Sequence, residues 1–426
     1  MRELAAPGSD WNGTMIQRLL SALLLIAWTI PAAPKLVVIS IDGLDHRWLR
    51  DADKLGVKIP NLRKLESRSA RADGVIGIVP TVTWPSHTTI ITGVSAPEHG
   101  IISNNQPDKP AERWWYASFL KTKTLWHLAR EKGMKTGAVW WPVTAGGEID
   151  YNFPEFWKDG NLHPRAMDPV LEQATPGLAD RVAAHFPSFR RSIFSDREMV
   201  LAARYILEVE KPELFLFHLG ELDSEQHETG AFSVNAKATL EYQDELLGPL
   251  LDALPADTYV ALVSDHGFDT DDRALRPQAM LNDAGIKAAA DVSNGVIAVD
   301  SDEAARFFRA KIGQPDSVIA REVPMEEVRR FSPPMGKYTA VFEPVNGVMA
   351  RRGTDGPAIG PGSGGGNHGL WPTRRDYAAT FMLGGPGIKH KLIPTISMLE
   401  IGPTLAEALG VKLPNAKEKS LLSRLK

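Results

Sequence analysis

Three apolar segments of this chain are each followed closely by acidic or histidine side chains. The segments are residues 35–41, 213–219 and 258–263. The side chains that follow them are Asp42, Asp223, His227, Asp265 and His266. Short runs rich in aliphatic and β-branched residues are typical of buried strands in a parallel sheet. Because the carboxyl ends of parallel strands meet at one edge, we expect these side chains to gather there.

Further strands and helices alternate along the chain. The additional predicted strands are 74–79, 135–141 and 378–383, and the predicted helices are 59–69, 87–92, 125–132, 198–210, 236–254 and 398–409. This alternation predicts an α/β fold whose central, mostly parallel sheet is covered by helices on both faces. Residues 286–366 interrupt the alternation and end in a glycine-rich run, 360–366. We expect a single catalytic domain, 34–426, with an inserted cap at about 286–366 and a flexible return loop.

Composition narrows the chemistry. The 426 residues include no cysteine, which excludes disulfides, thiolate nucleophiles and cysteine-based metal sites. Any metal must therefore be held by histidine and carboxylate ligands. The net charge of −4 gives no reason to expect a nucleic-acid polymer or an anionic membrane as partner. Small anions remain possible ligands of a local site.

The N-terminus has the pattern of a signal peptide within an extension, residues 1–33. Arg18 precedes an apolar run from Leu19 to Ile30, and Pro31-Ala32-Ala33 follows it. Such a run is too short to span a bilayer and fits the apolar core of a signal peptide, although a buried helix is the alternative. We predict an exported protein, periplasmic or secreted, with no stable membrane span in its mature form.

Each acidic loop alone is weak evidence for a metal. Asp42 could simply cap the next helix, and an Asp-x-x-x-His pair is more often a surface ion pair than a ligand set. Asp42 and His46 show the same spacing as Asp223 and His227. Together with His368 in a fourth polar loop, however, three Asp and three His would meet at one sheet edge. Six such ligands can hold two divalent metal ions about 3.5–4 Å apart.

Residues 80–105 crowd hydroxyls, prolines, histidines and asparagines into one short stretch. Such a stretch is poor core material, because each buried polar group must find a partner. It is well suited to present one hydroxyl to a substrate, and our hypothesis is that Thr83 is a metal-activated nucleophile. The residues alone leave Thr83 open beside Thr81, Ser86, Thr88 and Thr89.

The chain resembles the nucleotide pyrophosphatase/phosphodiesterase family of the alkaline phosphatase superfamily, from Lys35 to about Pro414. The most specific segments are Pro80-Thr-Val-Thr-Trp-Pro-Ser-His87, Thr92-Gly93, His99-Gly100-Ile101, Trp140-Trp141-Pro142, Asp223 to His227, Ser264-Asp-His-Gly267, His368-Gly369 and Gly385-Pro386-Gly387. Their common order and spacing make the resemblance specific. It implies an alkaline-phosphatase-like fold and hydrolysis of phosphodiester or pyrophosphate bonds in nucleotides or small alcohol phosphodiesters.

The resemblance also implies roles for single residues. Thr83 would be the nucleophile that forms a phospho-threonine intermediate, and Asn104 would hydrogen-bond a non-bridging phosphate oxygen. Two divalent ions, expected to be Zn²⁺, would be bound. The first would be held by Asp42, Asp265, His266 and Thr83. The second would be held by Asp223, His227 and His368.

Two departures from the family pattern bear on the substrate pocket. The family often has Pro-Asp-x-x-Gly-His where this chain has Leu222 to His227, and Asn where this chain has Ser86. Trp84, next to the nucleophile, is the expected substrate contact. Its ring could stack on a nucleobase or cover a choline, and a core tryptophan is the alternative.

Other functions compete with the diesterase. A phosphomonoesterase needs extra positive charge for a dianionic phosphate, and residues 80–105 contain no Lys or Arg. A transferase of phospho-alcohol groups would share the covalent intermediate. A sulfatase is disfavoured, because there is no Cys and no Ser-x-Pro-x-Arg segment. A non-catalytic exported binding protein would be expected to lack some of the six ligands, yet all six are present.

Overall fold

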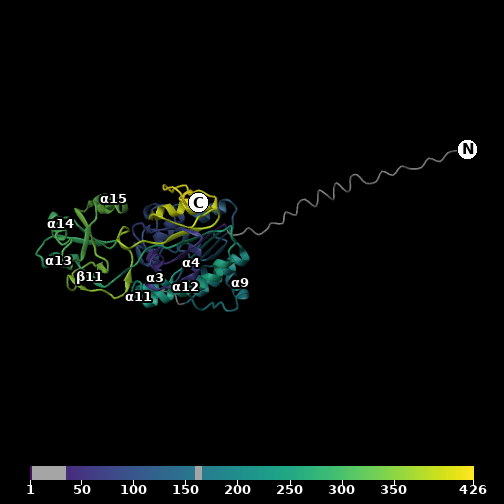
Figure 1. Ribbon diagram of the computed structural model, residues 1–426, viewed down its shortest axis with the longest axis horizontal. Coiled ribbons are helices and arrows are strands. Elements are labelled where there is room, and N and C mark those ends of the chain that lie inside the picture. Colours follow the sequence, from purple (N-terminus) through teal and green to yellow (C-terminus); the bar gives the residue numbers. More distant parts are fainter. Residues whose placement is uncertain (2–34, 159–165) are drawn as a thin grey trace. The chain divides into compact units, whose positions relative to one another are not determined.

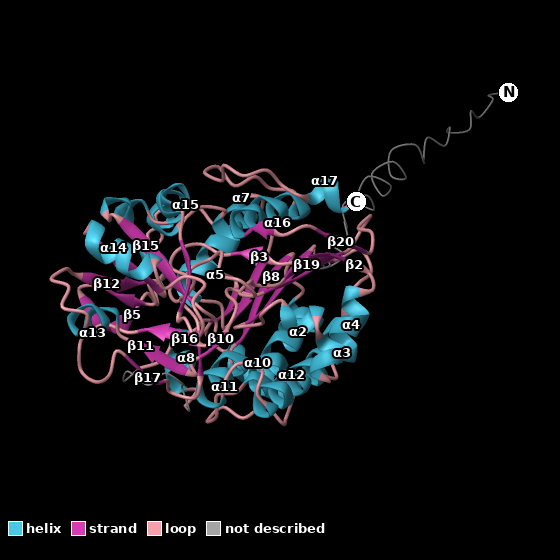
Figure 2. Ribbon diagram, turned by 60° about the vertical axis from the view of Figure 1, so that its left-hand side comes forward, coloured by secondary structure: helices cyan, strands magenta, loops and turns pink. Residues whose placement is uncertain are grey.

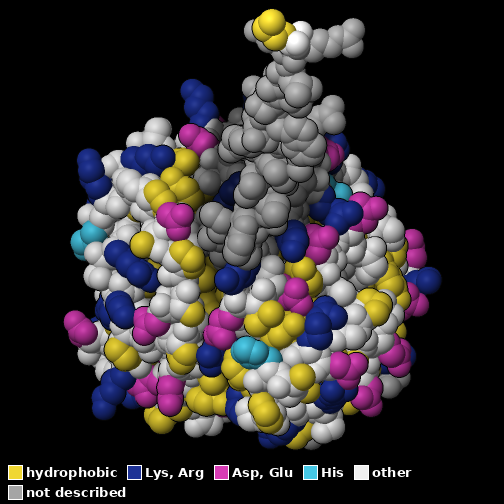
Figure 3. All heavy atoms as spheres, turned by 90° about the vertical axis from the view of Figure 1, so that its right-hand side faces the viewer, with side chains coloured by type: hydrophobic (Ala, Val, Ile, Leu, Met, Phe, Trp, Pro, Cys, Tyr) yellow, Lys and Arg dark blue, Asp and Glu magenta, His cyan; other side chains and the backbone are white. Residues whose placement is uncertain are grey.

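The computed structural model describes Met1 and residues 35–158 and 166–426. The predicted signal peptide lies outside the described residues. Those from 35 onwards belong to one compact unit. Within the part of the chain that the structure describes, no helix has the length and apolar character needed to cross a membrane. On the face in Figure 3, basic and acidic side chains are interspersed, as expected for a net charge near zero.

A central eight-stranded sheet organises the fold (Figure 2). Its strands are β1 (Leu36–Ile41), β2 (Ser69–Ala72), β6 (Thr136–Val139), β7 (Tyr151–Phe153), β8 (Leu214–Leu219), β9 (Tyr259–Val263), β19 (Phe381–Gly384) and β20 (Lys391–Ile393). Their order is β20-β2-β19-β9-β1-β8-β6-β7. Strand β1 pairs in parallel with β8 and β9, whereas β19 runs antiparallel to β9 and β2. The mostly parallel central sheet is therefore confirmed, with one reversed strand.

Alternating side chains of β1 enter two separate cores. Val37 and Ile39 face one core and Leu36 and Val38 face the other, as the two-residue period of a strand requires. The first core is covered by α4 (Pro60–Glu66), α10 (Asp196–Tyr205) and α12 (Val234–Ala253). The second is covered by α5 (Thr83–Thr92), α7 (Leu125–Glu131) and α16 (Ile401–Leu409). Helices thus cover both faces, as predicted.

The region predicted as a cap contains sheets and a core of its own. A four-stranded antiparallel sheet has the order β12-β13-β15-β14. Its strands and helices are β12 (Ala290–Ser293), β13 (Val296–Val299), α14 (Asp302–Arg309), β14 (Ile319–Glu322), α15 (Met325–Phe331) and β15 (Ala340–Pro344). A three-stranded sheet combines β11 (Arg273–Leu275), β16 (Val348–Ala350) and β17 (Ile359–Pro361), so this group of elements begins before residue 286. Figure 1 shows these elements grouped in green.

Several predicted boundaries differ from the structure. The predicted strand 74–79 is only β3 (Val75–Ile76), and the helix predicted from His87 begins four residues earlier at Thr83. The helix predicted over 59–69 ends at Glu66, because Ser69 already begins β2. The early start of α5 matters most, because it places Thr83 inside a helix rather than in the loop before one.

Candidate active site

Thr83 is the first residue of α5, a helix buried along its whole length. Val82 before it is extended, so the chain turns from extended to helical at Thr83. The first N–H groups of a helix have no partner within the helix and favour negative charge. A side chain at this position therefore lies at the positive end of the helix, although the Trp84 N–H is bonded to Asn104 Oδ1 and Pro85 has no N–H.

The ends of three parallel strands bring the acidic loops together. Ile41 of β1 pairs with Leu219 of β8, and Ser40 pairs with Val263 of β9, so the three strands end at one level. Asp42 follows β1 directly, and Gly43 then takes a left-handed φ of 65°. A Cβ at Gly43 would lie 3.0 Å from the Phe268 ring, so glycine fits both the turn and the space.

The first candidate ligand group consists of Asp42, Asp265 and His266, all buried. His266 Nε2 lies 3.3 Å from Asp42 Oδ1 and 3.0 Å from Asp265 Oδ2. The other oxygen of Asp265 accepts a hydrogen bond from the Gly43 N–H at 3.1 Å. One ligand atom from each of the three residues lies within 4.8 Å of the others, a spacing that could hold one metal ion.

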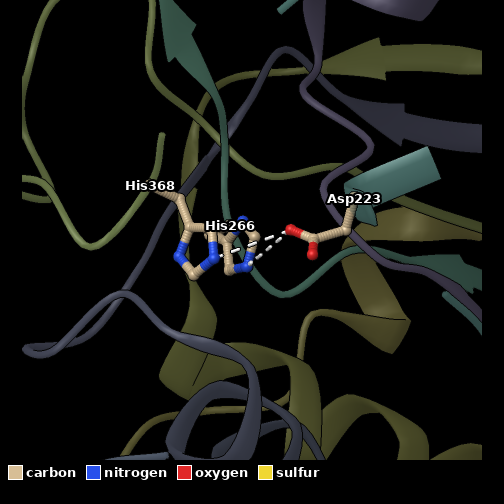
Figure 4. A group of neighbouring side chains, drawn as sticks. All are labelled: Asp223, His266 and His368. Carbon is tan, nitrogen blue, oxygen red and sulfur yellow. Dashed lines mark ion pairs between the residues drawn. The ribbon is translucent and has the colours of Figure 1, made fainter. Parts of the chain in front are cut away.

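A second group lies beside the first, around Asp223 on α11 (Glu221–Thr229). Asp223 Oδ1 is 3.6 Å from His227 Nε2, 3.6 Å from His368 Nε2 and 3.9 Å from His266 Nε2. Asp223 and His227 share one face of α11 because they are four residues apart. Figure 4 shows the Asp223 carboxylate facing the imidazoles of His266 and His368, which stack with ring centres 3.7 Å apart.

The three histidines share one orientation. Each donates a hydrogen bond from Nδ1 to a backbone carbonyl: His266 to Gly267 at 3.2 Å, His227 to Gly366 at 3.1 Å and His368 to Thr81 at 3.3 Å. A carbonyl can only accept, so Nδ1 holds the proton in all three rings. The Nε2 atom of each ring then faces a carboxylate. This is the arrangement in which histidine binds a metal while a backbone partner fixes its tautomer.

The buried carboxylates of the first ligand group create an electrostatic environment that favours a bound cation. Burial, and then the charges of Asp265 and Asp223, raises the pKa of Asp42 well above its usual value. Burial would also raise the pKa of Asp265, but His266 and His87 beside it lower it overall. Asp42 Oδ1, Asp265 Oδ2 and His266 Nε2 are buried without a hydrogen bond among the described residues. A divalent ion would neutralise these carboxylates and bind these atoms, so the residues fit such an ion.

Every residue predicted for the site lies at or beneath one cavity. The cavity has a volume of about 610 Å³, and its lining includes Asp42, Thr83, Trp84, Asn104, Asp223, His227 and His368. Asp265 and His266 are buried behind its floor. The close clusters differ from the predicted ligand sets in two respects, because His266 belongs to both of them and His227 belongs to neither. Among the described lining residues none comes from 286–366.

Trp84 has features of both predicted roles, a substrate contact and a core tryptophan. It lines the cavity, yet it is only 3% exposed and belongs to the core on one side of the sheet. The Trp157 ring meets it edge to face at 5.8 Å. The Arg113 guanidinium lies over its ring, 4.5 Å from the centroid. The surface that Trp84 offers to a substrate is therefore shared with an arginine.

Three functional candidates were missed by the sequence analysis: Arg113, Glu155 and His218, all of which line the cavity. His218 Nε2 lies 3.1 Å from Asp42 Oδ2, and its Nδ1 donates to the Trp140 carbonyl at 3.0 Å. A polar residue within the otherwise apolar run 214–219 was a usable signal for His218. Arg113 had no such signal, because only the folded hairpin brings it to the cavity.

His87 and His99 have structural partners. His87 donates from Nδ1 to the Thr83 carbonyl at 2.9 Å and accepts from the Ser40 hydroxyl at 2.8 Å. Burial lowers the pKa of His99 to about 3, so this ring is neutral, and it contacts the Thr89 hydroxyl at 3.1 Å. Both rings hold helix α5 in place, and His87 Nδ1 also lies 3.8 Å from Asp265 Oδ2.

The sheet and the cluster at its edge define an α/β protein of alkaline-phosphatase-like architecture with a candidate metal centre. A family model described as type I phosphodiesterase / nucleotide pyrophosphatase matches residues 36–380. The chain belongs to this family. The predicted family is therefore confirmed.

Curated relatives are similar over part of the chain. Ectonucleotide pyrophosphatase/phosphodiesterase family member 3 of Bos taurus is 25% identical over 258 residues, which cover 55% of this chain and 25% of the relative. Venom phosphodiesterase of Naja atra is 26% identical over 255 residues, which cover 55% of this chain and 26% of the relative. The match thus spans about a quarter of the length of these relatives.

Solved structures support the fold. Murine ectonucleotide pyrophosphatase/phosphodiesterase 5, as an inactive threonine-to-alanine variant in complex with AMP, matches with a TM-score of 0.59 and 17% identity, covering 92% of this chain and 100% of the other. The human counterpart gives a TM-score of 0.60 and 17% identity, covering 92% and 99%. The predicted fold class is confirmed by this likeness.

Proposed function

We propose that this protein is a metal-dependent hydrolase of phosphodiester or pyrophosphate bonds in nucleotides or small alcohol phosphodiesters. The observation that supports this best is the common orientation of His227, His266 and His368, whose Nε2 atoms face carboxylates at the cavity that Thr83 lines. Two divalent ions, expected to be Zn²⁺, would be held by the two ligand sets predicted from the family. When bound, they would neutralise phosphate oxygens and lower the pKa of the attacking hydroxyl.

Thr83 acts as the nucleophile in this proposal. Its Oγ forms a bond to phosphorus while the bond from phosphorus to the leaving oxygen breaks, and the hydroxyl proton passes to solvent. The leaving oxygen takes a proton from solvent. Water then adds to the phospho-threonine, the Thr83 Oγ–P bond breaks, and a proton returns to Thr83. The positive end of the α5 helix dipole favours the negative phosphate throughout.

Asn104 positions the phosphate. Its Oδ1 accepts a hydrogen bond from the Trp84 N–H at 3.1 Å, so its amide oxygen is already in use. The amide NH₂ is then the group available to a non-bridging phosphate oxygen. Such a fixed donor stabilises charge that develops in the transition state.

Membership of the family supports a small phosphodiester or nucleotide as substrate. The inactive threonine-to-alanine variant of the murine relative supports a threonine nucleophile on this fold. Names such as venom phosphodiesterase and ectonucleotide pyrophosphatase support an exported protein, periplasmic or secreted. We treat residues 34–426 as one catalytic domain with the cap as an insertion.

Turnover by the full chain, loaded with zinc, tests the proposal. The panel is bis(p-nitrophenyl) phosphate, p-nitrophenyl phosphate, ATP and glycerophosphocholine, with wild type, Thr83→Ala and Ser86→Ala. Ser86 is the matched control, because its buried hydroxyl has no hydrogen bond among the described residues. We expect Thr83→Ala to lower kcat by about 10⁴-fold or more while it keeps its metal. Near-normal turnover by Thr83→Ala would refute the nucleophile, and no diester hydrolysis by wild type would refute the function.

A further inference from the structure

An arginine lies in the substrate cavity beside the phosphate-binding residues. Arg113 ends β5 (Lys109–Arg113), which forms a hairpin with β4 (Asn105–Gln106). In this hairpin Arg113 pairs with Asn105, the neighbour of Asn104, and its carbonyl accepts from the Gln106 side chain at 2.9 Å. The same hairpin therefore sets the positions of Arg113 and of the proposed phosphate contact.

Two tryptophans hold the Arg113 guanidinium. Its central carbon lies 4.5 Å from the Trp84 ring centroid and 5.0 Å from that of Trp157. Cation–π contacts of this kind orient a guanidinium without using its N–H donors. Among the described residues, the guanidinium has no hydrogen-bond or ion-pair partner. Five N–H donors are thus held in place, partly buried and unpaired, inside the cavity.

Arg113 is the one cationic Lys or Arg side chain among the described residues that line the cavity. Glu155 is the buried carboxyl whose charge acts most strongly on it, yet no ion pair joins the two. Burial lowers the pKa of Arg113, and Glu155 and Asp223 oppose that shift. A guanidinium starts from so high a pKa that Arg113 stays protonated at neutral pH.

This arrangement discriminates between the two substrate groups that Trp84 could meet. A choline would need an open aromatic face, but the ring of Trp84 already has a cation over it. A second cation there would be repelled. A phosphate, in contrast, would pair with the free guanidinium donors, and arginine binds phosphate oxygens through two parallel hydrogen bonds.

We propose that Arg113 is a specificity-determining residue that selects substrates with a second phosphate next to the scissile one and rejects substrates with a cationic group there. The inference rests on the proposed hydrolase function and names a residue and a substrate class for the same cavity. Trp84 and Trp157 are positioning residues in this view, since they hold the guanidinium rather than stack on the substrate.

The test compares Arg113→Gln and Arg113→Lys with wild type on three substrates. ATP has further phosphates, bis(p-nitrophenyl) phosphate has an uncharged second group, and p-nitrophenylphosphocholine has a cationic one. Lys109→Gln is the matched control, because it removes one positive charge from an exposed position of the same strand. Thermal unfolding of each variant shows whether the hairpin has kept its fold.

We expect Arg113→Gln to lower kcat/KM for ATP by about 10- to 100-fold through KM, since charge-assisted hydrogen bonds of this kind are lost. Turnover of bis(p-nitrophenyl) phosphate should stay within about twofold, and that of the phosphocholine ester should rise. Arg113→Lys should recover part of the ATP activity. Lys109→Gln should match wild type on all three substrates.

A binding measurement separates this inference from the proposed function. Calorimetry with ATP on Thr83→Ala, and on Thr83→Ala combined with Arg113→Gln, needs no turnover. We expect the double variant to bind ATP at least about tenfold more weakly. Equal affinities, equal losses on all three substrates, or a wild-type preference for the phosphocholine ester would overturn the role of Arg113. If wild type hydrolysed no diester but the two variants still differed in ATP affinity, the proposed hydrolase function would be wrong. The role of Arg113 in binding phosphate would then remain supported.

Discussion

The backbone N–H of Trp84 donates a hydrogen bond to Oδ1 of Asn104 at 3.1 Å, which decides which way the Asn104 amide faces. Because Trp84 follows Thr83, the donor that fixes Asn104 belongs to the first turn of the helix that carries the proposed nucleophile. The Asn104 NH₂ is thereby left for the substrate. The proposed phosphate contact and the proposed nucleophile are tied by one hydrogen bond across 20 residues of sequence.

Replacement of Asn104 should therefore reduce turnover with little effect on folding. We expect Asn104→Ala to lower kcat on bis(p-nitrophenyl) phosphate by about 10²-fold, since one fixed donor to the developing charge is lost. Asn104→Asp keeps the acceptor for Trp84 but replaces the donors with a negative charge, so it should be at least as inactive. Asn346→Ala, at an exposed asparagine that donates to the Arg375 carbonyl, is the control. Activity of Asn104→Asp close to wild type would contradict the assigned orientation.

Metal content should depend on His266 more than on any other histidine. His266 belongs to both close ligand clusters, so its loss should affect both ions. We expect elemental analysis to give about two zinc ions per wild-type chain and fewer than about one for His266→Ala. His99→Ala is the matched control, because His99 is equally buried and its ring nitrogens contact the Thr89 hydroxyl and the Ile101 N–H. Equal zinc in wild type and His266→Ala would exclude the proposed centre.

The sequence predicted the centre of the sheet well because the information there is local. The apolar runs 35–41, 213–219 and 258–263 became β1, β8 and β9 within one residue at their ends. Burial on both faces requires such continuous apolar runs, so the pattern is distinctive. Their polar loops met at one edge because parallel pairing leaves no other arrangement. The gathering of these side chains could be predicted on this basis, whereas the ligand role of each one was implied only by the family resemblance.

The remainder depends on long-range contacts that leave no periodic pattern. The run 378–383 gave no sign that β19 would be antiparallel, since strand direction is set by the path of the chain through the cap region. Arg113 reaches the cavity through a short hairpin of mostly exposed residues, which has no apolar alternation to predict it. Residues 80–105 contain no Lys or Arg, yet the guanidinium of Arg113, from outside this stretch, lies over the Trp84 ring.

The stability of the protein should fall as pH rises from about 4 to about 7 through Asp196. Burial, and then the nearby charge of Glu221, raises the pKa of Asp196 to about 7, from an ordinary value of 3.8. Between these values the folded chain binds a proton that the unfolded chain has lost, so the free energy of unfolding decreases with pH. The slope for one group is at most about 1.4 kcal/mol per pH unit. Above pH 7 both states are ionised and the loss is complete.

Asp196→Asn should remove this dependence. Asp196 accepts hydrogen bonds from the N–H groups of Gly220 and Glu221 and from the Gln243 amide, and an asparagine oxygen can replace only part of them. The measurement is urea unfolding of wild type and variant in EDTA, from pH 4 to pH 8, so that metal loss does not contribute. The advantage of wild type over Asp196→Asn should shrink by a few kcal/mol as pH rises. Asp252→Asn, at an exposed carboxylate of α12, is the control. A difference in unfolding free energy between wild type and Asp196→Asn that stays constant with pH would contradict the raised pKa of Asp196.

The glycine-rich run 360–366, predicted to be a flexible return loop, contains glycines that close packing requires. A Cβ on Gly365 would fall well inside the van der Waals radius of the His227 carbonyl oxygen. The next residue, Gly366, accepts the hydrogen bond that fixes the His227 ring, at 3.1 Å. The glycine-rich run therefore packs against the backbone of His227, a predicted metal ligand. Only glycine allows so close an approach, because any side chain would clash with the His227 carbonyl.

Gly365→Ala should consequently weaken both stability and metal binding. We expect a loss of about 1–3 kcal/mol in the free energy of unfolding, typical of overpacking, together with a lower zinc content. Gly364→Ala is the control, because a Cβ there meets nothing within 4 Å, although its φ of 79° disfavours alanine. That variant should lose about 1–2 kcal/mol from backbone strain alone and keep its zinc. Since both variants alter the same loop, equal zinc contents would mean that the contact of Gly365 with His227 has no part in holding the metal ligand.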